Sequence, residues 1–170
     1  MTQEGFPRHE WITRLAGEER QRDAVVALAR TAAVRDAELV TEHGPRLLES
    51  LGLIIAGDVA RFRDEFPGDP VRHLALDIAE HGGFEARRSG YPTVVLTVSP
   101  QWTSGVVACR YRFTPSAELP VREDRFTLGF TPHGGDVCFK HQGSGEVFAV
   151  LHALSEYLLT PLFTGRPRVG

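Results

Sequence analysis

The segment Thr93-Val-Val-Leu-Thr-Val-Ser99 decides how the rest of the chain is interpreted. Its apolar residues fall at every second position, and successive side chains of a strand point to opposite faces of the sheet. Val106-Val-Ala-Cys-Arg-Tyr-Arg-Phe113 alternates in the same way. The link between them, Pro100-Gln-Trp-Thr-Ser-Gly105, is short and ends in glycine, as in many hairpins. These two segments therefore predict an antiparallel hairpin with one apolar face.

A second hairpin is predicted downstream, beyond a charged loop. Apolar and other residues alternate over 125–130, and a further run spans 137–141. The turn between them contains Pro-His-Gly-Gly. We expect Thr131 to lie opposite Asp136, because that register aligns the apolar residues of both strands on one face.

Together these strands predict an inner face that a helix must cover, since a large apolar side chain contributes about 1.5 to 3 kcal/mol when buried. The outer face is predicted to carry basic groups with little acid. The expected inner residues are Val94, Leu96, Val98, Val107, Cys109, Tyr111, Phe113, Phe126, Leu128, Phe130, Val137 and Phe139. The expected outer residues are Thr97, Arg110, Arg112, Arg125, Thr127 and Lys140.

Helical periodicity is found on both sides of this region. Two main helices are predicted over about 18–43 and 45–66, separated at Gly44-Pro45, which reads as a stop followed by a restart. The first helix has only a thin apolar stripe. A C-terminal helix is predicted over about 145–160 and is expected to stop at Pro161. The tail after it is expected to be loose.

Residues 71–90 fit two structures. Asp69-Pro70 could cap a helix that stops at Gly82. Alternatively, Leu74, Leu76 and Ile78 alternate as in a strand, with a turn before a second strand over 84–88. We favour the hairpin, because its His-Gly-Gly turn recurs near residue 134. The fold class is thus α+β: an antiparallel β-meander of about five to six strands (69–170, with the last helix), packed on one face by helices and preceded by a helical N-terminal arm (1–68).

Composition limits the classes of function. A chain of 170 residues suits one structural domain, and its net charge of −3 favours no general affinity for nucleic acid or anionic membranes. No secretory signal or membrane span is apparent, so we expect a cytoplasmic protein with no membrane partner. Cys109 and Cys138 are predicted on opposite sheet faces, which favours two reduced thiols.

The densest group of reactive side chains is a possible metal site. It comprises His133, Asp136, Cys138 and His141, all of which are residue types that bind zinc. Cys138 and His141 are three apart on one strand and so point to opposite faces. We therefore predict no metal, and no cofactor motif is present.

Two sites for anions are also considered. Free amides at a helix N-terminus near Lys140, at Ser144 and Gly145, could hold a phosphate, although a serine cap explains the same residues. The outer basic face, formed by Arg110, Arg112, Arg125 and Lys140, could bind a nucleic-acid backbone. Its predicted lack of outward aromatics argues against base stacking, so nucleic acid is not favoured.

An enzyme is disfavoured. Ser155, His152 and Glu156 could suggest a hydrolase, but Ser155 lies on a regular predicted helix without a nucleophile elbow. No base is placed beside either thiol. Catalytic groups converging from distant segments stay an alternative.

The sequence therefore favours a non-enzymatic protein that acts through association, with itself or as an adaptor or chaperone-like binder of a protein partner. The thin apolar stripe of the first helix and the absence of an assembled catalytic set motivate this prediction. Its alternatives are an anion or nucleic-acid binding module on the basic face, and a small enzyme with a site between sheet and helices. A bare, arginine-lined sheet would favour the binding module, and an exposed apolar helical stripe would favour association.

Overall fold

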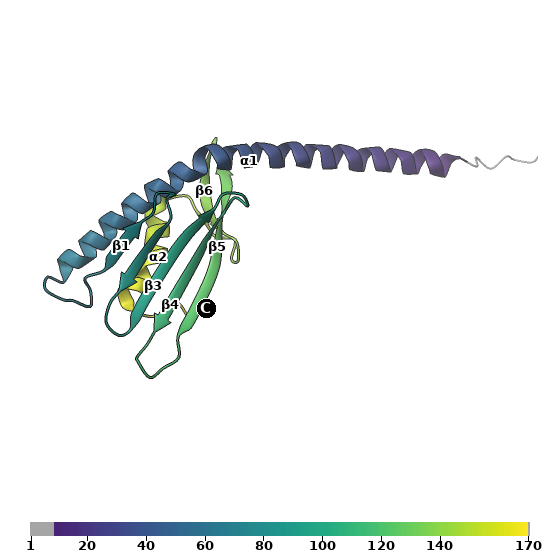
Figure 1. The fold of residues 1–170 in the computed structure, drawn as a ribbon. Helices are drawn as coiled ribbons and strands as arrows, with labels where there is room; N and C mark the ends of the chain where they lie inside the picture. Colours follow the sequence, from purple (N-terminus) through teal and green to yellow (C-terminus); the bar gives the residue numbers. More distant parts are fainter. Residues whose placement is uncertain (1–8, 170) are drawn as a thin grey trace, which may run out of the picture. The chain divides into compact units, whose positions relative to one another are not determined.

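The computed structural model describes residues 9–169, which form the predicted α+β fold (Figure 1). Helix α1 spans Glu10–Glu65, and helix α2 spans Leu151–Thr164. Between them, within the described residues, lies a seven-stranded antiparallel meander curled into a half-barrel, one strand more than the longest meander expected. Its strands follow chain order: β1 Ala75–Ile78, β2 Phe84–Arg88, β3 Thr93–Gln101, β4 Val106–Thr114, β5 Arg122–His133, β6 Asp136–His141 and β7 Val147–Phe148.

The ambiguous segment over 71–90 is the favoured hairpin. Strands β1 and β2 pair antiparallel, with Ile78 opposite Phe84. The turn between them is closed by a hydrogen bond from the amide of Ala79 to the carbonyl of Gly83 (2.8 Å). The capped-helix alternative is wrong, because the apolar residues here alternate with period two and extend the sheet.

The register of the β5–β6 hairpin differs from the expected one by two residues. Thr131 lies opposite Cys138, and His133 lies opposite Asp136. The turn is only two residues long, and Gly134 and Gly135 both have positive φ, at 58° and 84°. Two glycines with positive φ form the tight turn that matches strand twist. Because the shift is even, every side chain keeps its predicted face.

Helix α1 passes through Gly44 and Pro45, so the predicted break between two helices is wrong. Gly44 is buried and is not among the glycines with positive φ, so it does not act as a helix stop. An added Cβ there would lie 3.0 Å from the Trp102 ring and 3.4 Å from Phe130. Gly44 therefore serves close packing of the helix on the sheet. Pro45 removes one helical donor, yet the helix continues.

Helix α2 also differs at both ends from the predicted span. It begins at Leu151 because the short strand β7 precedes it. Pro161 lies inside the helix, which ends at Gly165 with φ 71°. The amide of Gly165 bonds the carbonyl of Pro161 (2.9 Å), a left-handed glycine cap.

The tail after α2 is held against the helix. The guanidinium carbon of Arg168 lies 3.3 Å from the centroid of the Tyr157 ring. The expectation of a loose tail is therefore wrong at Arg168, and its last residue, Gly170, lies outside the described residues. A cation over an aromatic face is attracted by the electron-rich face of the ring quadrupole.

The core lies between the inner sheet face and both helices. All predicted inner residues are buried except Phe126 and Phe130, which are partly buried and packed against the core. In Figure 1, α2 lies behind the sheet. The helices contribute Leu48, Leu51, Ile55, Val59, Leu154, Leu158, Leu159 and Leu162.

The chain divides into two compact units, residues 1–37 and 38–170. The buried core belongs entirely to the second unit. It includes Leu48 to Val59 of α1, so this part of the helix packs with the sheet. Of the N-terminal unit, residues 9–37 are described, and residues 1–8 of the expected arm lie outside the described residues. Neither helix of residues 9–169 has an apolar stretch suited to crossing a membrane.

Candidate functional site

The basic outer face is open, because the second unit's helices pack on the opposite face of the sheet. Arg110 lies directly opposite Arg125, and both are exposed. Arg112 is exposed beside them and lies opposite Glu123. Three predicted cations are thus brought together on β4 and β5.

Lys140 is apart from these arginines. It is exposed on β6, opposite Gly129. Gly129 is four residues along β5 from Arg125, a distance of about 13 Å at the usual strand rise. The predicted basic face is therefore an arginine cluster with a separate lysine.

The arginine cluster is only partly neutralised. Glu123 accepts a hydrogen bond from Nη2 of Arg125 (2.8 Å). This bond, together with the charges of Arg125, Arg110 and Arg112, lowers the pKa of the Glu123 carboxyl. Among residues 9–169, the side chains of Arg110 and Arg112 have no hydrogen bond or ion pair. Glu123 is not predictable as a member of this face from its own segment, because the residue that it faces depends on strand register.

Arg88, although basic and on a strand, is not part of the outer face. It is buried, and its Nη1 donates a hydrogen bond to the carbonyl of Phe163 at the end of α2. Burial lowers the pKa of its guanidinium, and the nearby charge of Arg72 lowers it further. Arg88 thus joins sheet and helix.

A shallow hollow lies beside the arginine cluster. Its volume is about 460 Å³. Two side-chain rows cross it: Thr97 faces Arg110, which faces Arg125, and the next row holds smaller side chains. That smaller row consists of Ser99, Ala108 and Thr127. The small side chains leave space between the arginines and the strand ends.

The predicted amide site at the β6–β7 turn has its donors occupied. The amide of Ser144 donates to Nδ1 of His141 (3.0 Å), and that of Gly145 donates to the carbonyl of His141 (2.8 Å). The turn leads into β7, so these amides do not begin a helix. Neither bonded amide is available to a phosphate, and Lys140 points to the outer face. The geometry therefore gives an anion site at this turn no support.

The possible metal ligands do not converge. No group of three His, Cys, Asp or Glu side chains among the described residues is placed to hold an ion. Asp136 instead lies 3.5 Å from Nδ1 of His43, on α1. His141 stacks on Phe126, with ring centroids 5.0 Å apart. Burial, and then the charge of Asp136, raises the pKa of the Cys138 thiol, which disfavours the reactive thiolate.

The residues considered for a hydrolase do not form a catalytic set. Ser155 is fully buried and donates a hydrogen bond to Oδ2 of Asp58 (2.5 Å), which ties α2 to α1. His152 and Glu156 line a surface hollow of about 340 Å³ whose lining does not include Ser155. A buried hydroxyl that donates to a carboxylate has no access to a substrate.

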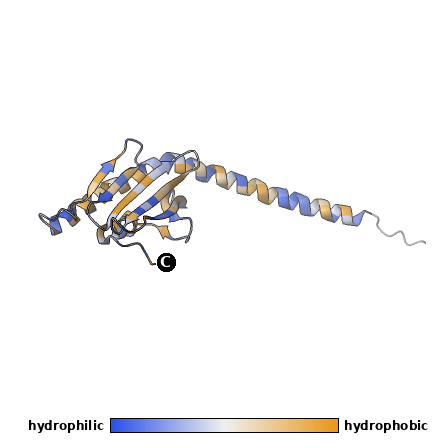
Figure 2. Cartoon of the chain, turned by 60° about the horizontal axis from the view of Figure 1, so that its bottom comes forward, coloured by the Kyte–Doolittle hydropathy of each residue, from blue (hydrophilic) through white to orange (hydrophobic). Residues whose placement is uncertain are grey.

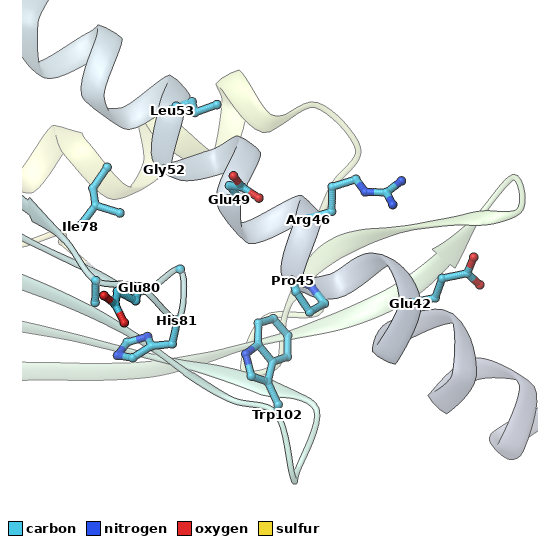
Figure 3. Close-up of a pocket in the computed structure, with 12 residues that line it drawn as sticks. Glu42, Pro45, Arg46, Glu49, Gly52, Leu53, Ile78, Glu80, His81 and Trp102 are labelled. Atoms are coloured by element: carbon cyan, nitrogen blue, oxygen red, sulfur yellow. The ribbon is translucent and has the colours of Figure 1, made fainter.

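The largest of the hollows is a groove that the sequence analysis did not predict (Figure 3). Its volume is about 700 Å³, and it lies between α1 and the turns after β1 and β3. Trp102 lies below Pro45, while His81 uses Nδ1 to accept the amide of Gly83 (3.1 Å). Glu42 and Glu49 line it from the helix. Among the described residues, the acidic side chains that line the groove do not converge with a histidine or cysteine on one point. The groove therefore contains no recognisable catalytic or metal-binding set.

Residues 10–37 of the N-terminal unit form a helix with unburied apolar side chains. Residues 9–37 are exposed apart from Ala16, which is half-buried. Figure 2 shows hydrophobic segments along this part of α1, interspersed with hydrophilic ones. The exposed large residues are Trp11 (57% exposed), Ile12, Leu15, Val25, Val26, Leu28 (72%) and Val34.

Two features of the described residues therefore indicate a function. They are the exposed apolar side chains of residues 10–37 and the arginine-lined hollow of the sheet. Comparison of the chain with protein-family models, with curated proteins and with solved structures finds no match.

Proposed function

We propose that this protein acts by association, and that residues 10–37 of α1 form the contact with a second copy of the chain. The observation that carries the proposal is the exposure of large apolar side chains along this helix, among them Trp11, Val25 and Leu28. A lone helix gains most of its stability from packing an apolar face against a neighbour. Pairing would bury these side chains.

Charge supports a second copy as the partner. Residues 10–37 contain five arginines and five acidic residues, so the segment is neutral. A neutral helix of mixed charge does not repel an identical helix, whereas a strongly charged one would need an oppositely charged partner. Trp11 with Leu15, and Val25 with Leu28, are spaced three or four apart and so share a helix face.

The proposed role is non-enzymatic, and its proposed compartment is the cytoplasm. Cys109 and Cys138 are unpaired and buried, as expected of thiols in a reducing compartment. A protein partner other than a second copy, bound in an adaptor or chaperone-like manner, is the alternative within the same class. The two forms of association differ in whether purified protein assembles by itself.

Multi-angle light scattering of the purified full chain tests the proposal. We expect a dimer or larger assembly for the full chain and a monomer for residues 38–170, which keep the whole buried core. The double variant V25D/L28D is expected to be monomeric, because charges cannot be buried in an apolar helical contact without large cost. Val34→Asp is the matched control: Val34 is 59% exposed, but lies on the opposite side of the helix.

A full chain that stays monomeric throughout a concentration series contradicts self-association. A stoichiometric protein recovered with the full chain but not with V25D/L28D would then assign the same helix to a different partner. Equal loss of assembly in Val34→Asp would show that the charge, rather than the apolar stripe, is responsible.

A further inference from the structure

The hollow on the outer sheet face has the construction of a binding site for a small anion. One wall is formed by Arg110 and Arg125, which are directly opposed on adjacent strands. The floor is formed by Thr97, Ser99 and Thr127, which contribute three hydroxyl groups. Hydroxyl and guanidinium groups are hydrogen-bond donors, and guanidinium matches the geometry of phosphate oxygens.

The charges of the wall are not balanced by the protein. Like charges directly opposite each other on paired strands are destabilising. Arg125 has Glu123 as a partner at 2.8 Å, while Arg110 has no ion pair among residues 9–169. Two opposed cations with one carboxylate leave a positive charge beside the hollow. A bound anion would neutralise it.

The acidic residues at the other side of the sheet face do not supply that neutralisation. Glu85 lies opposite Thr97, on the side of the hollow away from the arginines. Oε1 of Glu85 is 3.4 Å from Nε of Arg87, and Nη2 of Arg87 also forms an ion pair with Oδ2 of Asp77 (2.7 Å). Arg87 with Asp77 and Glu85 thus leaves one negative charge on β1 and β2, on the far side of Thr97 from Arg110 and Arg125.

The hydroxyl of Thr97, at the edge of the hollow, is a second and independent indication of a missing partner. Its Oγ1 is buried and has no hydrogen-bond partner. A buried hydroxyl left unpaired costs about 1 to 3 kcal/mol, and nearly all such groups in folded proteins have a partner. Thr97 lines the hollow, so a rotation about its χ1 would turn this hydroxyl from its buried position toward a ligand oxygen there.

We propose that this hollow binds the phosphate group of a small phosphate monoester, with Arg110 and Arg125 holding the oxygens and the hydroxyls of Thr97, Ser99 and Thr127 forming the floor. A volume of about 460 Å³ is that of a small-molecule site. The site is independent of the helix proposed for self-association. It includes neither Lys140 nor the β6–β7 turn.

A small ligand fits better than a nucleic acid. Sheets that bind single-stranded RNA stack bases on outward aromatic side chains. In the strands of the described residues, no Phe, Tyr or Trp faces outward from the sheet, and Trp102 packs on Phe130 with ring centroids 6.0 Å apart. The arginine cluster is also short, since Lys140 lies well along β5 from Arg125.

Isothermal titration calorimetry of the full chain at low ionic strength tests the site, with phosphoserine and inorganic phosphate as probes. We expect saturable binding of phosphoserine at one site per chain, with inorganic phosphate competing. Arg110→Gln and Arg125→Gln should each weaken binding at least about tenfold, the usual effect of losing a hydrogen bond to a charged group. Arg87→Gln is the matched control on the same face and should bind normally.

A shape variant separates a built site from a diffuse positive surface. Ala108→Leu keeps every charge but fills the hollow, so we expect it to abolish phosphoserine binding. Circular dichroism of each variant checks that it is folded. Unchanged binding by Ala108→Leu, or no saturable binding of phosphoserine by the native chain, overturns the proposal. It is likewise overturned if a single-stranded oligonucleotide binds while phosphoserine does not, since the face would then recognise a polyanion.

Discussion

Gly44 is buried in α1 although glycine is among the poorest helix formers. Its lack of a side chain lets the helix approach the rings of Trp102 and Phe130. We expect Gly44→Val to lower the free energy of unfolding by about 1 to 3 kcal/mol, the usual cost of overpacking a core. Urea denaturation measures the change.

Gly57, in the same helix, is the matched control for this substitution. It is exposed, and an added Cβ there would meet nothing within 4 Å. Gly57→Val should be neutral or slightly stabilising, because valine is a somewhat better helix former than glycine. Equal destabilisation by both variants would refute the packing role of Gly44.

Sequence patterns predicted correctly whether a side chain is buried or exposed where the period-two alternation of one strand decides its face. Val94 and Leu96 are fully buried as expected, because alternation along a strand is independent of where the strand ends. Arg88 shares the inner side of β2 with Phe84 and Ala86. Alternation alone does not show how a guanidinium can be buried there, because its partner is a carbonyl at the end of α2, far away in the sequence.

At the level of single elements, the β5–β6 turn depends on two glycines in different ways. We expect Gly135→Ala to destabilise the protein by about 1 to 2 kcal/mol, the cost of a left-handed conformation for a residue with a Cβ. Gly134→Asn should be close to neutral, because Asn-Gly is a preferred pair for two-residue turns. Thermal unfolding of both variants distinguishes them. Comparable losses would contradict the assigned turn geometry.

Element boundaries were harder to predict than elements. The pair Gly44-Pro45 resembles a helix stop and restart, yet the glycine is used for packing against Trp102, which lies far away in sequence. Likewise, Gly143 and Gly145 resemble an entry into a helix but precede β7. A distant contact decides the structure at Gly44, whereas at Gly143 and Gly145 the pairing of Val147 with Lys140 across the turn decides it.

For the whole molecule, the tail after α2 folds back on that helix through one cation–π contact. Arg168 lies over Tyr157, so we expect Arg168→Ala to lower the free energy of unfolding by about 0.5 to 2 kcal/mol, the range of cation–π contacts. Val169→Ala is the control, because Val169 is fully exposed. Guanidinium denaturation measures both. No difference between them would show that the tail adds nothing to stability.

The candidate hollow could be predicted only in part. Arg110 and Arg125 were assigned correctly to the outer face from alternation alone. Their direct opposition, the facing Glu123 and the row of small side chains around Ala108 depend on strand register. Register is a property of the assembled sheet, so no single segment contains it.

The order of strands in the meander has one more consequence. The strands at the two ends of the order are short, β1 with four residues and β7 with two, but β6 pairs only with residues 128–133 of β5 and leaves residues 122–126 with a partner strand on one side alone. An edge strand exposes unpaired backbone groups on which another chain can build a fibril, and natural proteins keep such edges short. The longest open edge of the sheet is therefore residues 122–126 of β5, where four consecutive charged residues, 122–125, oppose the addition of a further chain.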